Sequence, residues 1–100
     1  MGARQRVYTK VTQVIVGAAS STLWTRVPSA SALVLVNTHA TQAVWMEPTG
    51  VAAVLGDGIY LGPQARLVFG DSGELPMPAA NVTGWATGAA TNVSVYWAAM

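Results

Sequence analysis

The chain has few charged residues for its size. Asp, Glu, Lys and Arg make up 9% of its 100 residues, whereas a typical soluble domain carries about 25%. Such charges normally keep a protein surface hydrated and separate from its neighbours. Because 52% of the residues are also hydrophobic, we interpret the chain as one subunit of an assembly, with part of its surface covered by another subunit.

Other absences narrow the classes of function. The chain has no cysteine, which excludes disulfides, thiolate metal sites and a cysteine nucleophile. The net charge of +1 is too small for the basic stripe that a nucleic-acid-binding protein needs, so we expect no nucleic-acid partner. No apolar run approaches the roughly 18 residues of a membrane-spanning helix, so we expect no membrane partner either.

No stretch shows the helical spacing of apolar residues, and short runs bounded by turn residues indicate strands instead. The expected strands are residues 6–16, 23–27, 32–37, 43–47, 59–61, 65–69, 82–87 and 92–97. The last two are expected to form a closing hairpin around residues 88–91. This pattern predicts an all-β fold, namely a single small β-sandwich, jelly roll or barrel of about eight short antiparallel strands. Residues 1–100 form one domain in this prediction, with residues 1–6 as a candidate flexible arm.

The sequence offers one apparent catalytic motif. Residues 70–73 (Gly-Asp-Ser-Gly) copy the start of the nucleophile motif of trypsin-like serine proteases, and His39 lies upstream. That motif continues with glycine, whereas Glu74 follows here, and a two-barrel protease needs roughly twice this length. We interpret the motif as a turn. One histidine without suitably spaced carboxylates makes no zinc site, and Asp71 and Glu74 are interpreted as solvated loop acids. We therefore expect no catalytic residue, no metal and no cofactor, and hence no enzyme.

Two groups of residues are candidates for contact with a partner. They are the cations Arg4, Arg6 and Lys10 and the tryptophans Trp24, Trp45, Trp85 and Trp97. The cations fit either a charged, solvated terminus or an arm that reaches an acidic patch on a neighbouring subunit. The tryptophans fit either the core or a contact with a sugar ring or a protein. Because four tryptophans are too many for so thin a core, we expect at least one to face a partner.

Several segments resemble one protein family. Residues 28–37, which end in Leu-Val-Leu-Val-Asn, and residues 43–47 are similar to consecutive strands of small β-proteins encoded among tailed-phage structural genes. Residues 58–69 resemble the segment Gly-Ile-x-Leu-x-Pro-Gly-x-x-Leu of that family, and residues 92–97 resemble its closing strand. The similarity extends over residues 28–97. It implies a component of the virion, and members of the family include capsid decoration (cement) proteins and tail and fibre modules.

These observations favour a non-enzymatic part of a phage particle. We expect a capsid decoration protein on the capsid surface that binds the major capsid protein or another virion protein and forms a homo-oligomer. A chain of 100 residues suits a small clamp better than a fibre, because a fibre needs length. The alternative is a receptor- or glycan-binding β module of a tail or head fibre that uses exposed tryptophans.

Overall fold

All eight expected strands are present in the structure, a computed structural model that describes residues 7–15, 17, 19–70, 73, 75–88 and 90–99. They are β1 (Val7–Ile15), β2 (Ser21–Trp24), β3 (Ala30–Asn37), β4 (Val44–Glu47), β5 (Ile59–Leu61), β6 (Arg66–Gly70), β7 (Val82–Ala86) and β8 (Thr91–Ala99). The second strand begins and ends earlier than expected, since residues 25–27 lie outside any strand. The described residues contain no helix that is long and apolar enough to cross a membrane.

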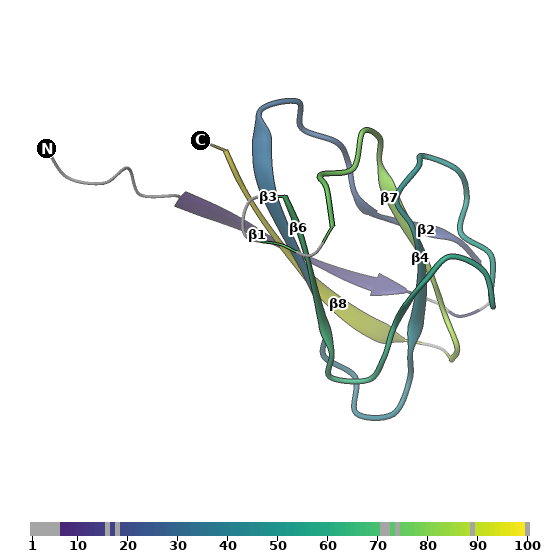
Figure 1. Cartoon of the computed structure of the whole chain (residues 1–100). Coiled ribbons are helices and arrows are strands. Elements are labelled where there is room, and N and C mark those ends of the chain that lie inside the picture. Colours follow the sequence, from purple (N-terminus) through teal and green to yellow (C-terminus); the bar gives the residue numbers. More distant parts are fainter. Residues whose placement is uncertain are drawn as a thin grey trace, which may run out of the picture.

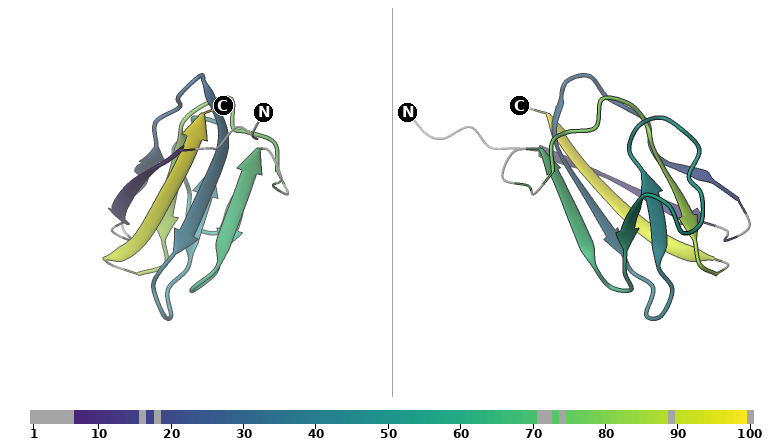
Figure 2. Two further views of the ribbon diagram at one scale, coloured as in Figure 1. Left: turned by 90° about the vertical axis from the view of Figure 1, so that its left-hand side faces the viewer. Right: turned by 45° about the vertical axis from the view of Figure 1, so that its right-hand side comes forward.

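The strands form two antiparallel sheets of four strands packed face to face. One sheet has the order β1-β8-β3-β6, and the other has the order β2-β7-β4-β5. Figure 2 shows the first sheet face-on in its left view, with the second sheet behind it. The strands pair as β1 with β8, β2 with β7, β3 with β6 and β4 with β5. This nested pairing is that of a long hairpin folded into two layers, which is the jelly-roll topology (Figure 1).

The topology corrects two of the expectations. β7 and β8 do not form a closing hairpin, because they lie in different sheets and the chain crosses from one sheet to the other between them. A closed barrel is also wrong, since β1, β6, β2 and β5 each pair along one edge only among the described strands. The architecture is a two-sheet sandwich with four strand edges.

Alternation along each strand directs apolar side chains between the sheets. On β3, Leu33 and Leu35 are fully buried, whereas Val34 between them is only half-buried. The apolar run of residues 32–37 predicts a strand buried on both faces, and this prediction is wrong for the outer face of β3. The core is made of the following residues: Ile15, Leu23, Trp24, Leu33, Leu35, Val44, Met46, Leu61, Phe69, Val82, Ala86, Val93 and Val95.

Glycine is required at two positions that set the distance between elements. A Cβ on Gly84 of β7 would lie 2.9 Å from Leu23 Cδ1 and 3.0 Å from Ile15 Cδ1, so the bare backbone lets the sheets approach closely. Gly58 has a φ of +105°, and a Cβ there would collide with the carbonyl oxygen of Met46. The sequence Gly-Asp-Gly at residues 56–58 predicts a turn, and the structure has one there that returns the chain to the edge of β4.

A buried amide ties the loops at one end of the sandwich together. Asn37, at the end of β3, is fully buried. Its Nδ2 donates to the carbonyl oxygens of Gln42 at 2.7 Å, Leu61 at 3.3 Å and Gly62 at 3.1 Å. Its Oδ1 accepts from the backbone N–H of His39 at 3.0 Å. One side chain thus links the loop after β3 to the loop after β5 through hydrogen bonds to their backbone groups.

Candidate interaction surfaces

The outer face of the β1-β8-β3-β6 sheet is mainly apolar. Val34 and Val36 point outward from β3, because their neighbours Leu33 and Leu35 are buried in the core. A shallow depression of about 390 Å³ lies on this face, and it is lined by Tyr8, Val34, Val36, Arg66 and Tyr96. We call this surface the aliphatic face.

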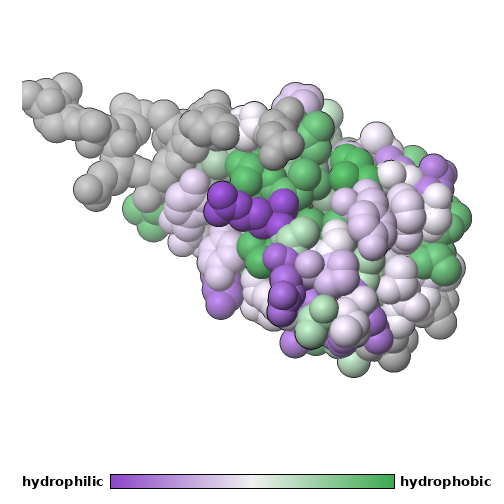
Figure 3. All heavy atoms as spheres, turned by 60° about the horizontal axis from the view of Figure 1, so that its bottom comes forward, coloured by the Kyte–Doolittle hydropathy of each residue, from purple (hydrophilic) through white to green (hydrophobic). Residues whose placement is uncertain are grey.

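Among the described residues, the strand positions that face outward on the aliphatic face carry two charged side chains, and both are cations. Lys10 of β1 lies opposite Tyr96 of β8, and its Nζ is 5.6 Å from the centroid of the tyrosine ring, within cation–π range. Arg66 of β6 lies opposite Val36 of β3 and is exposed. On the side that it presents, the space-filling view of Figure 3 shows strongly hydrophilic side chains beside a patch of hydrophobic ones. The aliphatic face therefore favours an apolar partner with some negative charge.

The outer face of the other sheet carries aromatic side chains in a row. Trp45 of β4 pairs with Trp85 of β7 on one side and with Tyr60 of β5 on the other. The rings of Trp45 and Tyr60 meet edge to face, with centroids 5.0 Å apart and planes at 63°. The side chain of Tyr60 is 56% exposed. We call Trp85, Trp45 and Tyr60 the aromatic row.

A loop that follows β4 is fixed to the same outer side. The hydroxyl of Thr83 on β7 donates to the carbonyl oxygen of Val51 at 2.8 Å. Farther along, the backbone N–H of Ala53 donates to the hydroxyl of Ser20 at 2.9 Å, just before β2. The two bonds hold residues 48–58 across β7 and beside β2. This outer face is therefore partly covered by the chain itself.

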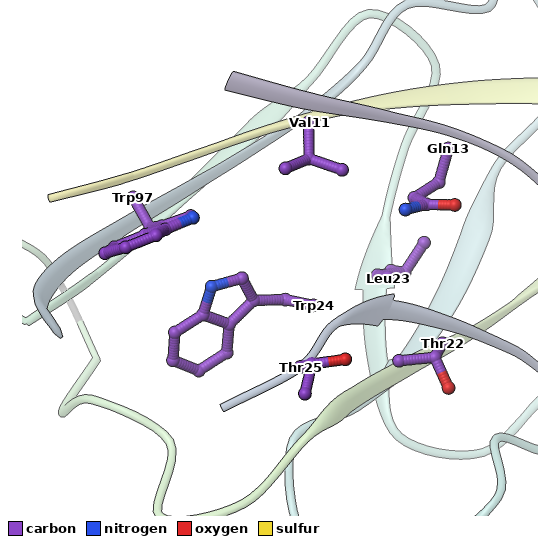
Figure 4. Close-up of a pocket in the computed structure, with 7 residues that line it drawn as sticks. All are labelled: Val11, Gln13, Thr22, Leu23, Trp24, Thr25 and Trp97. Atoms are coloured by element: carbon purple, nitrogen blue, oxygen red, sulfur yellow. The ribbon is translucent and has the colours of Figure 1, made fainter. Parts of the chain in front are cut away.

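A cavity opens between the edges β1 and β2, where the two sheets face each other without a further strand. It has a volume of about 350 Å³ and is lined by Val11, Gln13, Thr22, Leu23, Trp24, Thr25 and Trp97. Trp24 is 4% exposed, and its indole Nε1 has no hydrogen-bond acceptor among the described residues. In Figure 4 this nitrogen is turned toward Val11 and Trp97. We call this space the edge cavity.

The structure separates the four candidate tryptophans. Trp24 belongs to the core, and Trp97 packs against the core at the edge cavity. Trp45 and Trp85 lie on the outer face of their sheet, half-buried, and the Nε1 of Trp85 also has no acceptor among the described residues. The sequence alone could not assign each tryptophan to the core or to the outer face. Each one lies in or beside a strand, and which face its side chain takes depends on the exact position at which the strand begins.

The structure describes only some of the candidate cations and only some residues of the protease-like motif. Lys10 lies on the aliphatic face, whereas Arg4 and Arg6 lie outside the described residues, as does the expected arm of residues 1–6. Asp71, Ser72 and Glu74 also lie outside them.

No group of three or more His, Asp or Glu side chains among the described residues is placed to hold a metal ion. The ring of His39 shapes the loop between β3 and β4, since its Nδ1 accepts from the backbone N–H groups of Thr41 at 3.1 Å and Gln42 at 3.0 Å.

Comparison with known proteins identifies no relative. No protein-family model matches the chain, and neither a curated protein nor a solved structure matches it significantly. Function is therefore inferred from the aliphatic face, the aromatic row and the edge cavity.

Proposed function

We propose that this chain is a non-enzymatic structural component of a phage particle, a capsid decoration protein that stabilises the assembled shell. The observation that carries the proposal is the aliphatic face. A flat β-sheet surface with valines at its centre and cations at its margin suits a broad contact with another protein. The resemblance of residues 28–97 to small phage virion proteins supports the same assignment.

The aliphatic face also suggests the chemistry of the partner. Lys10 and Arg66 are exposed on this face, and no acid occupies its described strand positions. An acidic patch on the major capsid protein would complement these two cations and orient the approach. A protein that binds the assembled shell, and not its dissociated subunits, stabilises the shell by mass action.

One substitution tests the aliphatic face directly. Val34→Glu places an acid at the centre of the face, where a capsid contact would bury it unpaired. We expect the affinity of the purified chain for shells lacking it to fall by at least about tenfold. Ala52→Glu, in the exposed loop after β4, makes the same charge change elsewhere and should leave binding unaltered. Equal occupancy of shells by both variants would contradict a contact through this face.

Deleting the gene from the phage that encodes it tests the function as a whole. A decoration protein predicts particles that release their genome at lower temperature or under osmotic shock, yet adsorb normally to host cells. Particles of normal heat resistance with impaired adsorption would overturn the decoration role.

The aromatic row favours a second candidate, a receptor- or glycan-binding module. Ring faces and edges exposed on a rigid sheet are suited to stacking against a sugar or an apolar partner. Tyr60→Ala removes the most exposed ring of the row without touching the core. A glycan-binding module predicts impaired adsorption of particles with this variant and unchanged heat resistance, whereas a decoration protein predicts neither change.

A further inference from the structure

β1 is the least protected of the four strand edges. β5 has three residues, and β2 has four with a register shift inside it. β6 is covered at its end, where Phe69 bridges to Leu75 and the N–H of Gly70 donates to the Leu75 carbonyl. β1 has nine residues in unbroken register with β8, no proline and one charge. Natural edge strands usually carry bulges, prolines or several charges that prevent pairing with another chain, and β1 lacks these features.

Three of the large apolar side chains that are exposed among the described residues lie on β1, and three others lie in the loop after β4. Val7 is 80% exposed, Tyr8 48% and Val14 57%. The edge cavity opens beside the same strand, and its lining includes Trp24, whose buried indole N–H has no acceptor among the described residues. An unsatisfied buried donor is costly unless something supplies an acceptor. Among the described residues, the edge of β1 therefore has no pairing strand and the Trp24 N–H has no acceptor, and both lie along one side of the sandwich.

We propose that β1 pairs antiparallel with β1 of a second copy of this chain, about a two-fold axis at Val11. The first sheet of each copy would then continue into the other as one sheet of eight strands, twice the four in each copy. Each copy presents the same edge, so the contact is isologous and closes as a dimer. The proposal goes beyond the decoration role and does not depend on it.

The register centred on Val11 matches the side chains of β1 to one another. It places Tyr8 opposite Val14 of the second copy, so that exposed apolar side chains cover each other on the outer face. It places Lys10 opposite Thr12, so the charge of one copy does not directly face that of the other. Cross-strand contact of this kind is the main stabilising unit of a sheet.

The same register would also cover the mouth of the edge cavity. Val11 and Gln13 line the cavity and point between the sheets. Thr9 of the second copy would lie opposite Gln13, and Val11 of the second copy opposite Val11. Both side chains would project over the mouth of the cavity, and the Thr9 hydroxyl would bring an acceptor to the side where the Trp24 N–H lies. None of the inward-facing positions of β1 carries a charge, so this covering requires no buried ion.

The character of β1 favours a second copy over an unrelated strand. Its sequence alternates and is rich in valine and threonine, which are strand-forming residues. Paired with itself in this register, it places each exposed apolar side chain opposite another apolar one. No other described edge strand reaches this length.

Two substitutions at Thr12 test both the contact and its register. Thr12 is exposed and points outward, so either change should leave the fold intact. Thr12→Glu would face Lys10 of the second copy twice in the dimer, and we expect the dissociation constant to fall about tenfold. Thr12→Lys would create two opposed lysine pairs, and we expect the constant to rise about tenfold. Sedimentation equilibrium of the purified chain measures both.

Two controls make the test specific. Ala52→Lys adds the same charge on the exposed loop and should not change the dissociation constant. Amide hydrogen exchange of the unaltered chain should slow in β1 as concentration rises, while β5 shows no such change. A monomer at every concentration, or a dimer equally strong in both Thr12 variants, would overturn the proposal. Failure here would leave the decoration role standing, since none of these measurements involves a phage particle.

Discussion

Two regions at the margin of the sandwich differ in how their buried polar groups are hydrogen-bonded. At the end where a loop joins β5 to β6, which we call the closed side, the amide of Asn37 donates to three carbonyl oxygens. A short loop joins these two strands there, and the backbone N–H of Asn37 donates to the Ala65 carbonyl at 2.9 Å. On the side of β1 and β2, the open side, the indole N–H of Trp24 has no acceptor among the described residues.

This difference indicates which region of the sandwich has hydrogen-bond partners for its buried polar groups within the chain. Unpaired buried donors are rare in folded proteins, and each one calls for an explanation. The closed side has its own loops to satisfy the backbone, whereas the open side has an exposed strand and a cavity of about 350 Å³. A partner strand on the open side would make the two sides equivalent. Substitutions that remove or add side-chain atoms on each side, followed by measurement of the free energy of unfolding, test this difference.

Asn37→Ala should have the largest effect. It leaves the carbonyl groups of Gln42, Leu61 and Gly62 without the amide that now binds them. We expect a loss of about 3 kcal/mol in the free energy of unfolding, because three hydrogen bonds from a fully buried amide are lost together and each is worth about 1 kcal/mol. Urea unfolding followed by tryptophan fluorescence measures this loss.

A matched control lies on the outer face. Asn92 of β8 is exposed, and Asn92→Ala should change the free energy of unfolding by no more than about 0.5 kcal/mol. Equal losses for the two variants would mean that the Asn37 network does not hold the closed side together.

The sequence predicted the strands well and their partners poorly. Each strand could be located from alternating apolar residues and from the turn residues that bound it, because both patterns depend only on neighbouring residues. Residues 56–58 are an example, since they include two glycines of positive φ. The partner of β7 could not be found in this way, because residues 88–91 read equally well as a hairpin and as a crossing between sheets. Their crossing follows from the packing of both sheets against one core.

The sites were less predictable than the strands. Asn37 stands in the sequence as the polar end of an apolar strand, yet it is fully buried and binds the backbone of two loops. Its position between a buried strand and a polar loop was the available signal. Trp24 follows a register shift in β2, so counting alternate positions could not assign its face. The pairing of Trp45 with Tyr60 joins strands separated by a long loop, which sequence spacing does not specify.

Gly84→Ala should have an intermediate effect. The added methyl group would lie within 3.1 Å of Leu23 Cδ1, Ile15 Cδ1 and Val44 Cγ1, and overpacking of this kind costs about 1.5 kcal/mol. Leu23 borders the edge cavity, so it has space to move on the open side. The cost of Gly84→Ala should therefore shrink when Leu23→Ala is present, and a double-mutant cycle measures the coupling. Additive costs would indicate that the cavity does not relieve the contact.

Trp24→Phe should have the smallest effect, although its side chain is nearly as buried as that of Asn37. The smaller ring loses apolar contact, which lowers stability, but the change also removes a buried donor that has no acceptor. The two contributions are each about 1 kcal/mol and opposite in sign. At concentrations where the chain is monomeric, we expect the free energy of unfolding to change by less than about 1 kcal/mol. A loss as large as that of Asn37→Ala would mean that the indole N–H is already satisfied in the monomer, and that the open side needs no partner.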